Sequence, residues 1–247
     1  MKGTRAVLPK NVPGKVKDPS SPRILILETS GRTGHAALAR GNKLLRVRRL
    51  DETRRHASDL APAVGHLLVA ESWKPAEIQA LIVSRGPGSY TGLRVGIMAA
   101  KIFTYATGIP LIAVDTFAAI AHQLNLEIPA VHIVADAQQD KVYVQRFVRL
   151  MPGKPLSPIT SLTIISFADW LQSRELSDWV SGPGLRKFAS RLPGDSRVVP
   201  ESDWDPQPKS FLHIGLARYH NDERDDPWTL EPLYLRPSAA EEKWQKK

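Results

Sequence analysis

The residues with the clearest chemical meaning form a glycine-rich segment, 86–96, which reads GPGSYTGLRVG. It follows a short apolar run typical of a buried strand, and it opens a segment, 93–107, whose pattern predicts a helix. Such a turn presents backbone N–H groups at a helix N-terminus, where an anion is favoured. Gly86, Gly88 and Ser89 are therefore candidate anion-binding residues. A tight strand-to-helix connection packed for shape alone explains the motif equally well.

Other side chains give little support for catalysis. Ser89 does not lie in the Gly-x-Ser-x-Gly elbow of hydrolases. The seven histidines include no pair four residues apart, and the chain has no cysteine, so metal and thiolate chemistry are disfavoured. Glu28, Asp115 and Asp136 stand at the ends of expected strands, where carboxylates can hold a metal. Capping and turn roles account for Asp115 and Asp136 better. We expect no catalytic residue and no metal.

The net charge of +9 lies partly at the N-terminus, because residues 1–23 hold six lysines and arginines against Asp18. This segment is rich in proline and poor in large apolar residues, so residues 1–22 are expected to be a disordered basic extension. It would serve as a solubilising tail or as an arm that touches RNA phosphates. No apolar run approaches the ~20 residues of a membrane span, and no signal-peptide pattern opens the chain. We expect a cytoplasmic protein.

The segments that could carry chemistry lie in a strand-rich first half and in a second half that varies the same order of strands and helices. Expected strands cover 23–30, 35–40, 43–50, 78–83, 111–114, 130–134, 141–148, 162–165 and 178–180. Expected helices cover 53–72, 93–107, 116–126, 166–175, 185–191 and 208–219. Three strands followed by alternating helices and strands are typical of a ribonuclease-H-like half, so the predicted fold class is α/β with two such lobes. Each lobe would have a mixed sheet with helices packed on it.

The same pattern predicts the domain organisation. The first lobe would take residues 23–115 plus about 208–221, since the last helix is expected to pack back on the first half. The second lobe would take residues 116–207, with a Pro- and Asp-rich linker at 200–208. Residues 222–247 would form a C-terminal tail.

Several motifs, in this order, resemble the bacterial TsaB (YeaZ) family of the actin-like ATPase superfamily. They are LETS at 27–30, RRHAS at 54–58, the glycine-rich segment 86–96, GIPL at 108–111, the turn at 136–143 and PLYLR at 232–236. The glycine-rich segment and the C-terminal motif are the specific ones. The resemblance covers about residues 23–237 and leaves the basic extension outside.

This resemblance implies a role in RNA modification. A TsaB-like protein pairs with its paralogue TsaD and, with the ATPase TsaE, supports transfer of a threonylcarbamoyl group to adenosine 37 of tRNAs that read ANN codons. In this family, the TsaB-like protein is regarded as the non-catalytic member of the pair. TsaD holds a metal through a His-x-x-x-His pair, and the equivalent positions here are Thr116 and Ile120, which are not metal ligands. Contact with tRNA would come through the complex.

The superfamily also implies a nucleotide site between two turns. Its phosphates would lie between Glu28-Thr29-Ser30 and a turn near Asp136, and its adenosine against Gly182-Pro183-Gly184. The second turn reads Ala137-Gln138-Gln139, without glycine or hydroxyl, and Glu28 replaces the usual aspartate. We expect a degenerate site that requires no cofactor and binds ATP or ADP weakly at most. A stand-alone ATPase or small-molecule phosphotransferase of the actin-like fold remains the alternative function.

Two helices, 53–71 and 92–107, would carry the pairing, as they do in the family. Gly92, Gly96 and Ala100 recur every four residues and would let another helix approach closely. Packing against the protein's own sheet is an equal explanation for part of this strip. The expected interface residues are His56, Leu60, Val64, Gly92, Arg94, Gly96 and Ala100. The same surface would support a homodimer when the paralogue is absent.

Overall fold

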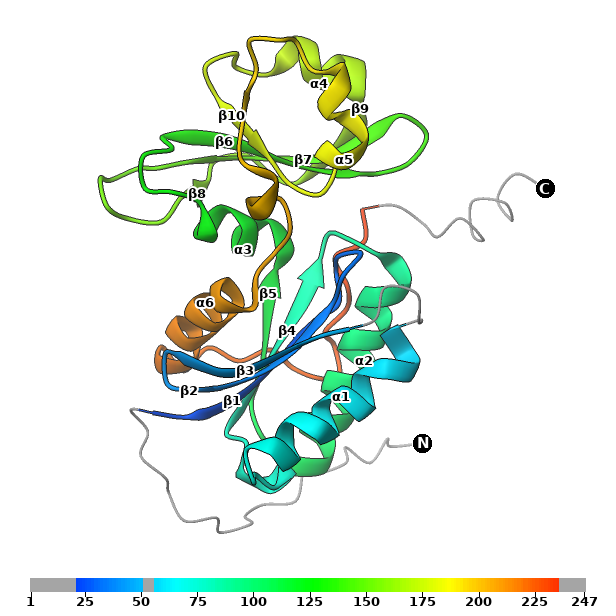
Figure 1. Cartoon of the computed structure of the whole chain (residues 1–247), viewed down its shortest axis with the longest axis vertical. Helices are drawn as coiled ribbons and strands as arrows, with labels where there is room; N and C mark the ends of the chain where they lie inside the picture. Colours follow the sequence, from blue (N-terminus) through cyan, green and yellow to red (C-terminus); the bar gives the residue numbers. More distant parts are fainter. Residues whose placement is uncertain (1–20, 51–55, 236–247) are drawn as a thin grey trace, which may run out of the picture.

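The computed structural model describes residues 21–50 and 56–235, which form two α/β lobes, one above the other in Figure 1. Each lobe contains a mixed β-sheet with helices packed on it, which confirms the predicted fold class. Within the described residues, no helix combines the length and apolar character needed to cross a membrane.

The first lobe contains a five-stranded sheet in the order β3-β2-β1-β4-β5. Its strands are β1 (Arg23–Glu28), β2 (His35–Arg40), β3 (Lys43–Arg49), β4 (Ala80–Gly86) and β5 (Leu111–Asp115). Strand β1 pairs antiparallel with β2 and parallel with β4. Its side chains alternate, so Leu25 and Leu27 enter one core cluster while Ile24 and Ile26 enter the other. Because both faces are apolar, both must be covered.

Helices cover the two faces of this sheet. Helices α1 (His56–Ala70) and α2 (Tyr90–Thr107) lie side by side on one face, and α6 (Pro208–His220) lies on the other (Figure 1). Phe211 and Leu212 of α6 are fully buried against the sheet. The first lobe is therefore built from segments on both sides of the second.

The second lobe contains a sheet in the order β11-β10-β6-β7-β8, with β9 also paired to β7. Its strands are β6 (Ala130–Asp136), β7 (Lys141–Val148), β8 (Ser157–Pro158), β9 (Thr163–Ser166), β10 (Trp179–Ser181) and β11 (Arg197–Val198). Helix α3 (Thr116–Gln123) packs on one face, while α4 (Phe167–Ser173) and α5 (Leu185–Phe188) pack on the other. Short 3₁₀ turns lie at Pro75–Glu77, Ala189–Arg191 and Glu201–Asp203.

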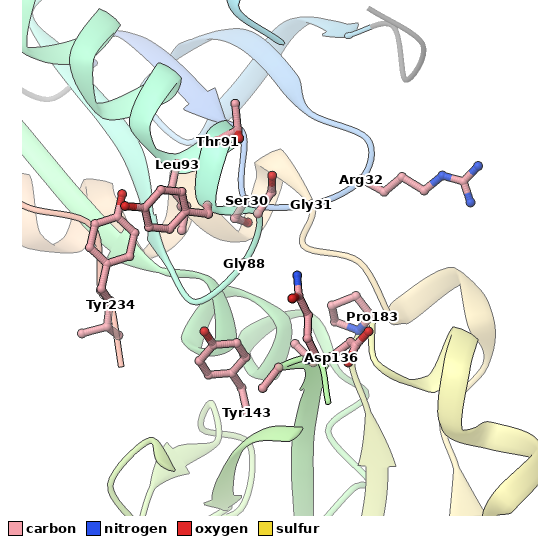
Figure 2. Close-up of a pocket in the computed structure, with 16 residues that line it drawn as sticks. Ser30, Gly31, Arg32, Gly88, Thr91, Leu93, Asp136, Tyr143, Pro183 and Tyr234 are labelled. Carbon is pink, nitrogen blue, oxygen red and sulfur yellow. Dashed lines mark hydrogen bonds between the residues drawn. The ribbon is translucent and has the colours of Figure 1, made fainter. Parts of the chain in front are cut away.

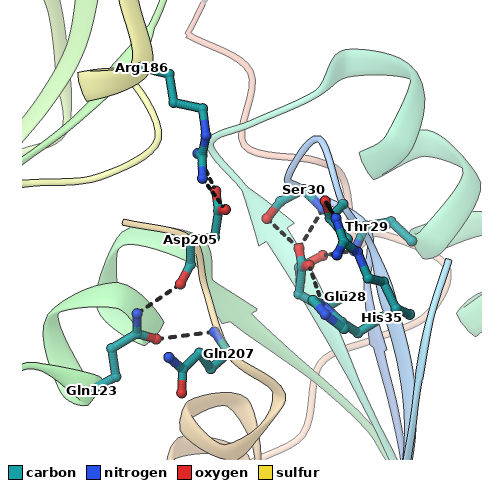
Figure 3. A network of polar contacts seen from close by, with 11 residues as sticks. Glu28, Thr29, Ser30, His35, Gln123, Arg186, Asp205 and Gln207 are labelled. Carbon is teal, nitrogen blue, oxygen red and sulfur yellow. Dashed lines mark hydrogen bonds and ion pairs between the residues drawn. The ribbon is translucent and has the colours of Figure 1, made fainter. Parts of the chain in front are cut away.

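The chain crosses between the lobes twice, once from β5 into α3 and once along residues 204–208. The side chain of Gln123 ties the second crossing to the first (Figure 3). Its amide nitrogen donates to the carbonyl oxygens of Asp203 and Asp205, and its oxygen accepts from the N–H of Gln207. The two crossings are thus held together at the end of α3.

After α6 the chain continues along the first lobe as a C-terminal segment, residues 225–235. Asp225 bridges to β5, and its carboxylate accepts from the N–H of Ala113 at 2.7 Å. Leu230 enters the core under α1 and α2, and the N–H of Leu233 donates to the carbonyl oxygen of Arg85. These contacts attach this stretch of the expected C-terminal tail, 222–247, to the first lobe.

Most expected elements are present, with shifted ends. Strand β4 runs on to Gly86, and α2 begins at Tyr90, three residues earlier than expected. Helix α3 stops at Gln123, and the helix expected over 185–191 divides into α5 and a 3₁₀ turn. The short strands β8 and β11 were not predicted, because their sequences show no strand pattern. The expected basic extension, 1–22, lies outside the described residues except for its last two positions.

Candidate functional site

A pocket of about 630 Å³ lies between the two lobes (Figure 2). The β1–β2 turn and the start of α2 form one side, and the β6–β7 turn forms the other. The C-terminal segment closes one end. The lining residues are Ser30, Gly31, Arg32, Gly88, Ser89, Tyr90, Thr91, Leu93, Ala135, Asp136, Ala137, Gln138, Tyr143, Pro183, Leu233 and Tyr234. Of the predicted site residues, the structure brings Ser30, Gly88 and Ser89 together here.

The glycine-rich turn packs tightly against the β1–β2 turn. A Cβ atom on Gly88 would lie 2.2 Å from the carbonyl oxygen of Ser30, so only glycine fits there. The N–H of Ser89 donates to that same oxygen at 2.7 Å, and the hydroxyl of Ser89 caps α2 by accepting from the N–H of Gly92. The N–H groups of Ser89 and Gly92, which were expected to face an anion, therefore both donate to atoms of the chain itself. Gly86 ends β4 at φ 118° and does not line the pocket.

Glu28 lies behind the first turn rather than in the pocket (Figure 3). Its side chain is fully buried, and one carboxylate oxygen accepts from the N–H and the hydroxyl of Ser30, both at 2.6 Å. The other oxygen lies 3.6 Å from Nδ1 of His35. Thr29 is also fully buried, and its N–H donates to the hydroxyl of Ser84. Both residues shape the turn from inside.

Two acidic residues of the second turn form ion pairs with basic residues of the segment 187–191. Both carboxylate oxygens of Asp136 lie within 3.1 Å of Nζ of Lys187, which neutralises the acidic group facing the pocket. Asp140 pairs with Arg191, and this hydrogen bond lowers the pKa of the Asp140 carboxyl. Gln138, like the two residues after it, has a positive φ without being glycine. The turn therefore differs from a glycine-lined phosphate turn in backbone and in charge.

The glycines of the expected adenosine turn have a packing cause. Gly182 has φ 111°, and a Cβ atom there would lie 2.3 Å from the carbonyl oxygen of Val134. A Cβ atom on Gly184 would lie 2.9 Å from Cα of Ala135. The residue that reaches the pocket is Pro183 between them. Neither glycine lines the pocket.

An aromatic wall at one end of the pocket is the feature that sequence reasoning missed. The rings of Tyr90 and Tyr234 stack at 4.7 Å, and the guanidinium of Arg94 lies 4.2 Å above the Tyr90 ring. Tyr143 of β7 also lines the pocket, and Figure 2 shows it below Tyr234 in that view. Tyr234 belongs to the PLYLR motif, so the motif was visible in the sequence while its position beside α2 was not. Tyrosines of this kind suit the flat face of a nucleobase.

The expected interface strip on α2 is buried inside the lobe. Gly92, Gly96 and Ala100 are all buried, and a Cβ atom on Gly96 would lie 2.1 Å from Oγ1 of Thr29. The strip thus packs on the chain's own β1 turn, which is the second of the two explanations that the sequence left open. Leu60 is buried as well, Val64 is half-buried and Arg94 is exposed. The side chain of His56 lies outside the described part.

Other residues of α1 and α2 are open instead. On α1, Ala61, Gly65 and Val69 are exposed at four-residue spacing, and nothing lies within 4 Å of a Cβ atom placed on Gly65. On α2, Met98, Ile102 and Tyr105 are exposed along one stripe. Trp228 packs edge-on against Tyr105. The open face therefore combines small residues on one helix with large apolar residues on its neighbour.

The positions equivalent to a metal-binding histidine pair are part of the core. Thr116 opens α3 and is buried, and Ile120 enters the core of the second lobe. Over residues 21–50 and 56–235, no group of three or more His, Cys, Asp or Glu side chains is placed to hold a metal ion.

Comparison with known proteins places the chain in a family. The model of the family described as TsaD, tRNA N6-adenosine threonylcarbamoyltransferase, matches residues 43–217. The chain is 26% identical over 228 residues to the tRNA threonylcarbamoyladenosine biosynthesis protein TsaB of Bacillus subtilis, covering 90% of this chain and 97% of the relative. It is 25% identical over 205 residues to the TsaB protein of Escherichia coli, covering 78% and 84%.

The fold has close structural neighbours as well. A Pseudomonas aeruginosa protein described as similar to peptidase YEAZ superposes with a TM-score of 0.75 at 23% identity, over 87% of this chain and 100% of that chain. The fold is thus shared across the whole of that protein. Taken with the sequence matches, the chain belongs to the TsaD-related family, in its TsaB (YeaZ) group.

Proposed function

We propose that this chain is a non-catalytic subunit in the formation of threonylcarbamoyladenosine in tRNA, acting in the cytoplasm as the partner of a TsaD-like paralogue. The observation that carries the proposal is the match along nearly the whole length of proteins named for this pathway. A TsaE-like ATPase would complete the machinery, and tRNA would meet the chain within the complex.

The open face of α1 and α2 supports a pairing role. Met98, Ile102 and Tyr105 are each more than half exposed, and such contiguous apolar stripes mark protein-binding surfaces. The small residues Ala61 and Gly65 lie on the neighbouring helix, where they leave room for a partner helix. We therefore assign the pairing surface to this face rather than to the buried Gly92–Gly96–Ala100 strip.

The polar groups near the pocket support a non-catalytic role. One carboxylate oxygen of Glu28 accepts from Ser30 and the group is fully buried, while the carboxylate of Asp136 is paired with Lys187. A phosphotransferase needs such carboxylates to hold a metal or activate a nucleophile. Glu28 does not line the pocket and Asp136 is already paired, which favours the subunit over the stand-alone ATPase.

Co-purification tests the pairing. The full chain and the TsaD-like protein of the same genome are expressed together, and the complex is then assayed for modification of an unmodified tRNA transcript with TsaE and threonylcarbamoyl-adenylate. A stable pair whose activity disappears without this chain is expected. No pairing, together with ATP hydrolysis by this chain alone, would reverse the assignment.

Paired variants sharpen this test. Met98→Asp with Ile102→Asp is expected to abolish pairing while the chain stays folded, because both side chains already face water. Leu150→Asp with Leu176→Asp is the matched control, since these are exposed apolar residues of the second lobe. Equal loss of pairing in both double variants would remove α2 as the interface.

A further inference from the structure

The positive charge of the chain is confined to its beginning. Residues 51–247 hold 22 lysines and arginines against 23 aspartates and glutamates. Residues 31–50 alone hold six cations and no acidic residue; the cations are Arg32, Arg40, Lys43, Arg46, Arg48 and Arg49. A charge asymmetry of this size points to a polyanionic partner.

The fold gathers five of these cations on one hairpin, formed by β2 and β3, and Arg32 precedes it in the β1–β2 turn. Strand β3 is the edge of the first sheet, so no other strand of the described residues covers its outer side. Lys43, Arg46 and Arg48 of β3 are all exposed. An arginine-rich edge can also serve to prevent sheets from joining edge to edge, but that purpose requires neither a single sign of charge nor arginine.

The register places three of these cations on the same side of the sheet. Arg46 lies opposite Leu38 and Arg48 opposite Ala36, and both of those partners belong to the core beneath α1 and α2. Lys43 lies opposite Arg40 at the hairpin end. Side chains directly opposite one another share a face, so the cations form a row along the α1 side of the edge. Arg46 is partly neutralised by Glu71 at 2.5 Å.

One neighbouring feature extends the row. Arg32 lines the interlobe pocket, and Figure 2 shows its side chain extending from the β1–β2 turn. The charged surface of the described residues therefore runs along β3, with Arg32 at the mouth of the pocket.

We propose that the β2–β3 hairpin is an RNA-contacting surface that binds the phosphate backbone directly. Four of its five cations are arginine, whose planar guanidinium binds phosphate oxygens through two parallel hydrogen bonds. The identification of that RNA as tRNA rests on the proposed function; the phosphate binding itself rests on the hairpin. The contact is independent of base sequence, because it reaches only the backbone.

Salt-dependent RNA binding tests the inference. The full chain, alone and with its paralogue, is titrated with an unmodified tRNA transcript at several salt concentrations, for the wild type and for Lys43→Gln, Arg46→Gln and Arg48→Gln combined. The slope of log affinity against log salt is expected to fall by roughly 2 to 3, since each lost phosphate contact removes about 0.7–0.9. Circular dichroism and co-purification verify folding and pairing.

A charge-matched control separates this site from a general effect of net charge. Lys141→Gln, Lys154→Gln and Arg197→Gln remove the same charge from exposed positions of the second lobe. This control is expected to keep the wild-type slope. An unchanged slope in the hairpin variant, or an equal decrease in both variants, would overturn the inference. So would lost pairing with unchanged RNA binding, because the hairpin would then contact the protein partner. A wild-type chain that binds RNA without pairing would count against the proposed function alone.

Discussion

The guanidinium Nε of Arg94 donates a 3.0 Å hydrogen bond to the phenolic oxygen of Tyr234, across 140 positions of sequence. Arg94 also lies over the ring of Tyr90, which stacks on Tyr234. This cluster joins the first turn of α2 to the C-terminal segment. The aromatic end of the pocket thus depends on residues from two distant parts of the sequence.

Removal of the Tyr234 ring should loosen the C-terminal segment. Tyr234→Ala is expected to lower the free energy of unfolding by about 1–2 kcal/mol, because the stacking and the hydrogen bond are lost together. Tyr234→Phe keeps the ring and should cost about 0.5 kcal/mol at this exposed site. Urea unfolding at constant pH measures both. Equal effects of the two variants would show that the ring stacking contributes nothing.

A pair of glycine substitutions distinguishes the buried strip from the open face. Gly96→Ala is expected to destabilise the fold by roughly 1–3 kcal/mol, since the new methyl would overlap the side chain of buried Thr29. Gly65→Ala is expected to stabilise it by about 0.5–1 kcal/mol, because α1 is open there and alanine is the better helix former. Thermal unfolding of both variants tests this. A stable Gly96→Ala protein would contradict the packing of α2 on the β1 turn.

Buried His132 should make stability fall in mild acid. Desolvation lowers its pKa from 6.5 to about 4, partly offset by Asp178 and reinforced by Arg146 and Arg174. Nδ1 of His132 accepts from the indole N–H of Trp170, which keeps the ring neutral. As the pH falls, the unfolded chain therefore takes up this proton at a higher pH than the folded chain does. The stability that comes from neutral His132 is complete above pH 6.5 and is lost as the pH falls toward 4.

The free energy of unfolding is expected to fall by on the order of 2 kcal/mol between pH 7.5 and pH 5. Unfolding free energies at the two pH values measure it. The comparison is made with His132→Gln, which lacks the titrating ring and should show a smaller decrease. His122 and His213, whose pKa values are also lowered by burial, remain in both proteins. An identical pH dependence in the variant would exclude His132 as a source.

The ion pair at the second turn should limit nucleotide binding. Asp136→Asn is expected to strengthen weak ATP binding several-fold, because Lys187 would be released toward the phosphates. Asp140→Asn is the control, since Asp140 pairs with Arg191 and does not line the pocket. Calorimetric titration of ATP without metal measures both. If neither the wild type nor Asp136→Asn binds ATP, the pocket is not a nucleotide site.

The strands, the helices and the glycine turn between β4 and α2 could be predicted because local patterns specify them. The packing role of each glycine could not be predicted in this way. Gly88, Gly96 and Gly182 each avoid a clash with backbone or side chain from a distant part of the sequence, and only the assembled fold shows which atom stands there. The same applies to Glu28, whose carboxylate faces inward to Ser30 instead of into the pocket. Proximity of Tyr234 to α2 likewise depends on the path of the C-terminal segment.

The insertion of the second lobe between β5 and α6 has a consequence for synthesis of the protein. When β5 leaves the ribosome, the sheet face formed by Ile24, Ile26 and Ile112 still lacks its cover, because α6 follows roughly 100 residues later. At about 5–20 residues per second, this face waits roughly 5–20 s for Phe211 and Leu212. The second lobe, continuous in sequence, can fold during that interval. The nascent chain is thus expected to need a chaperone on one specific apolar face until its last helix emerges.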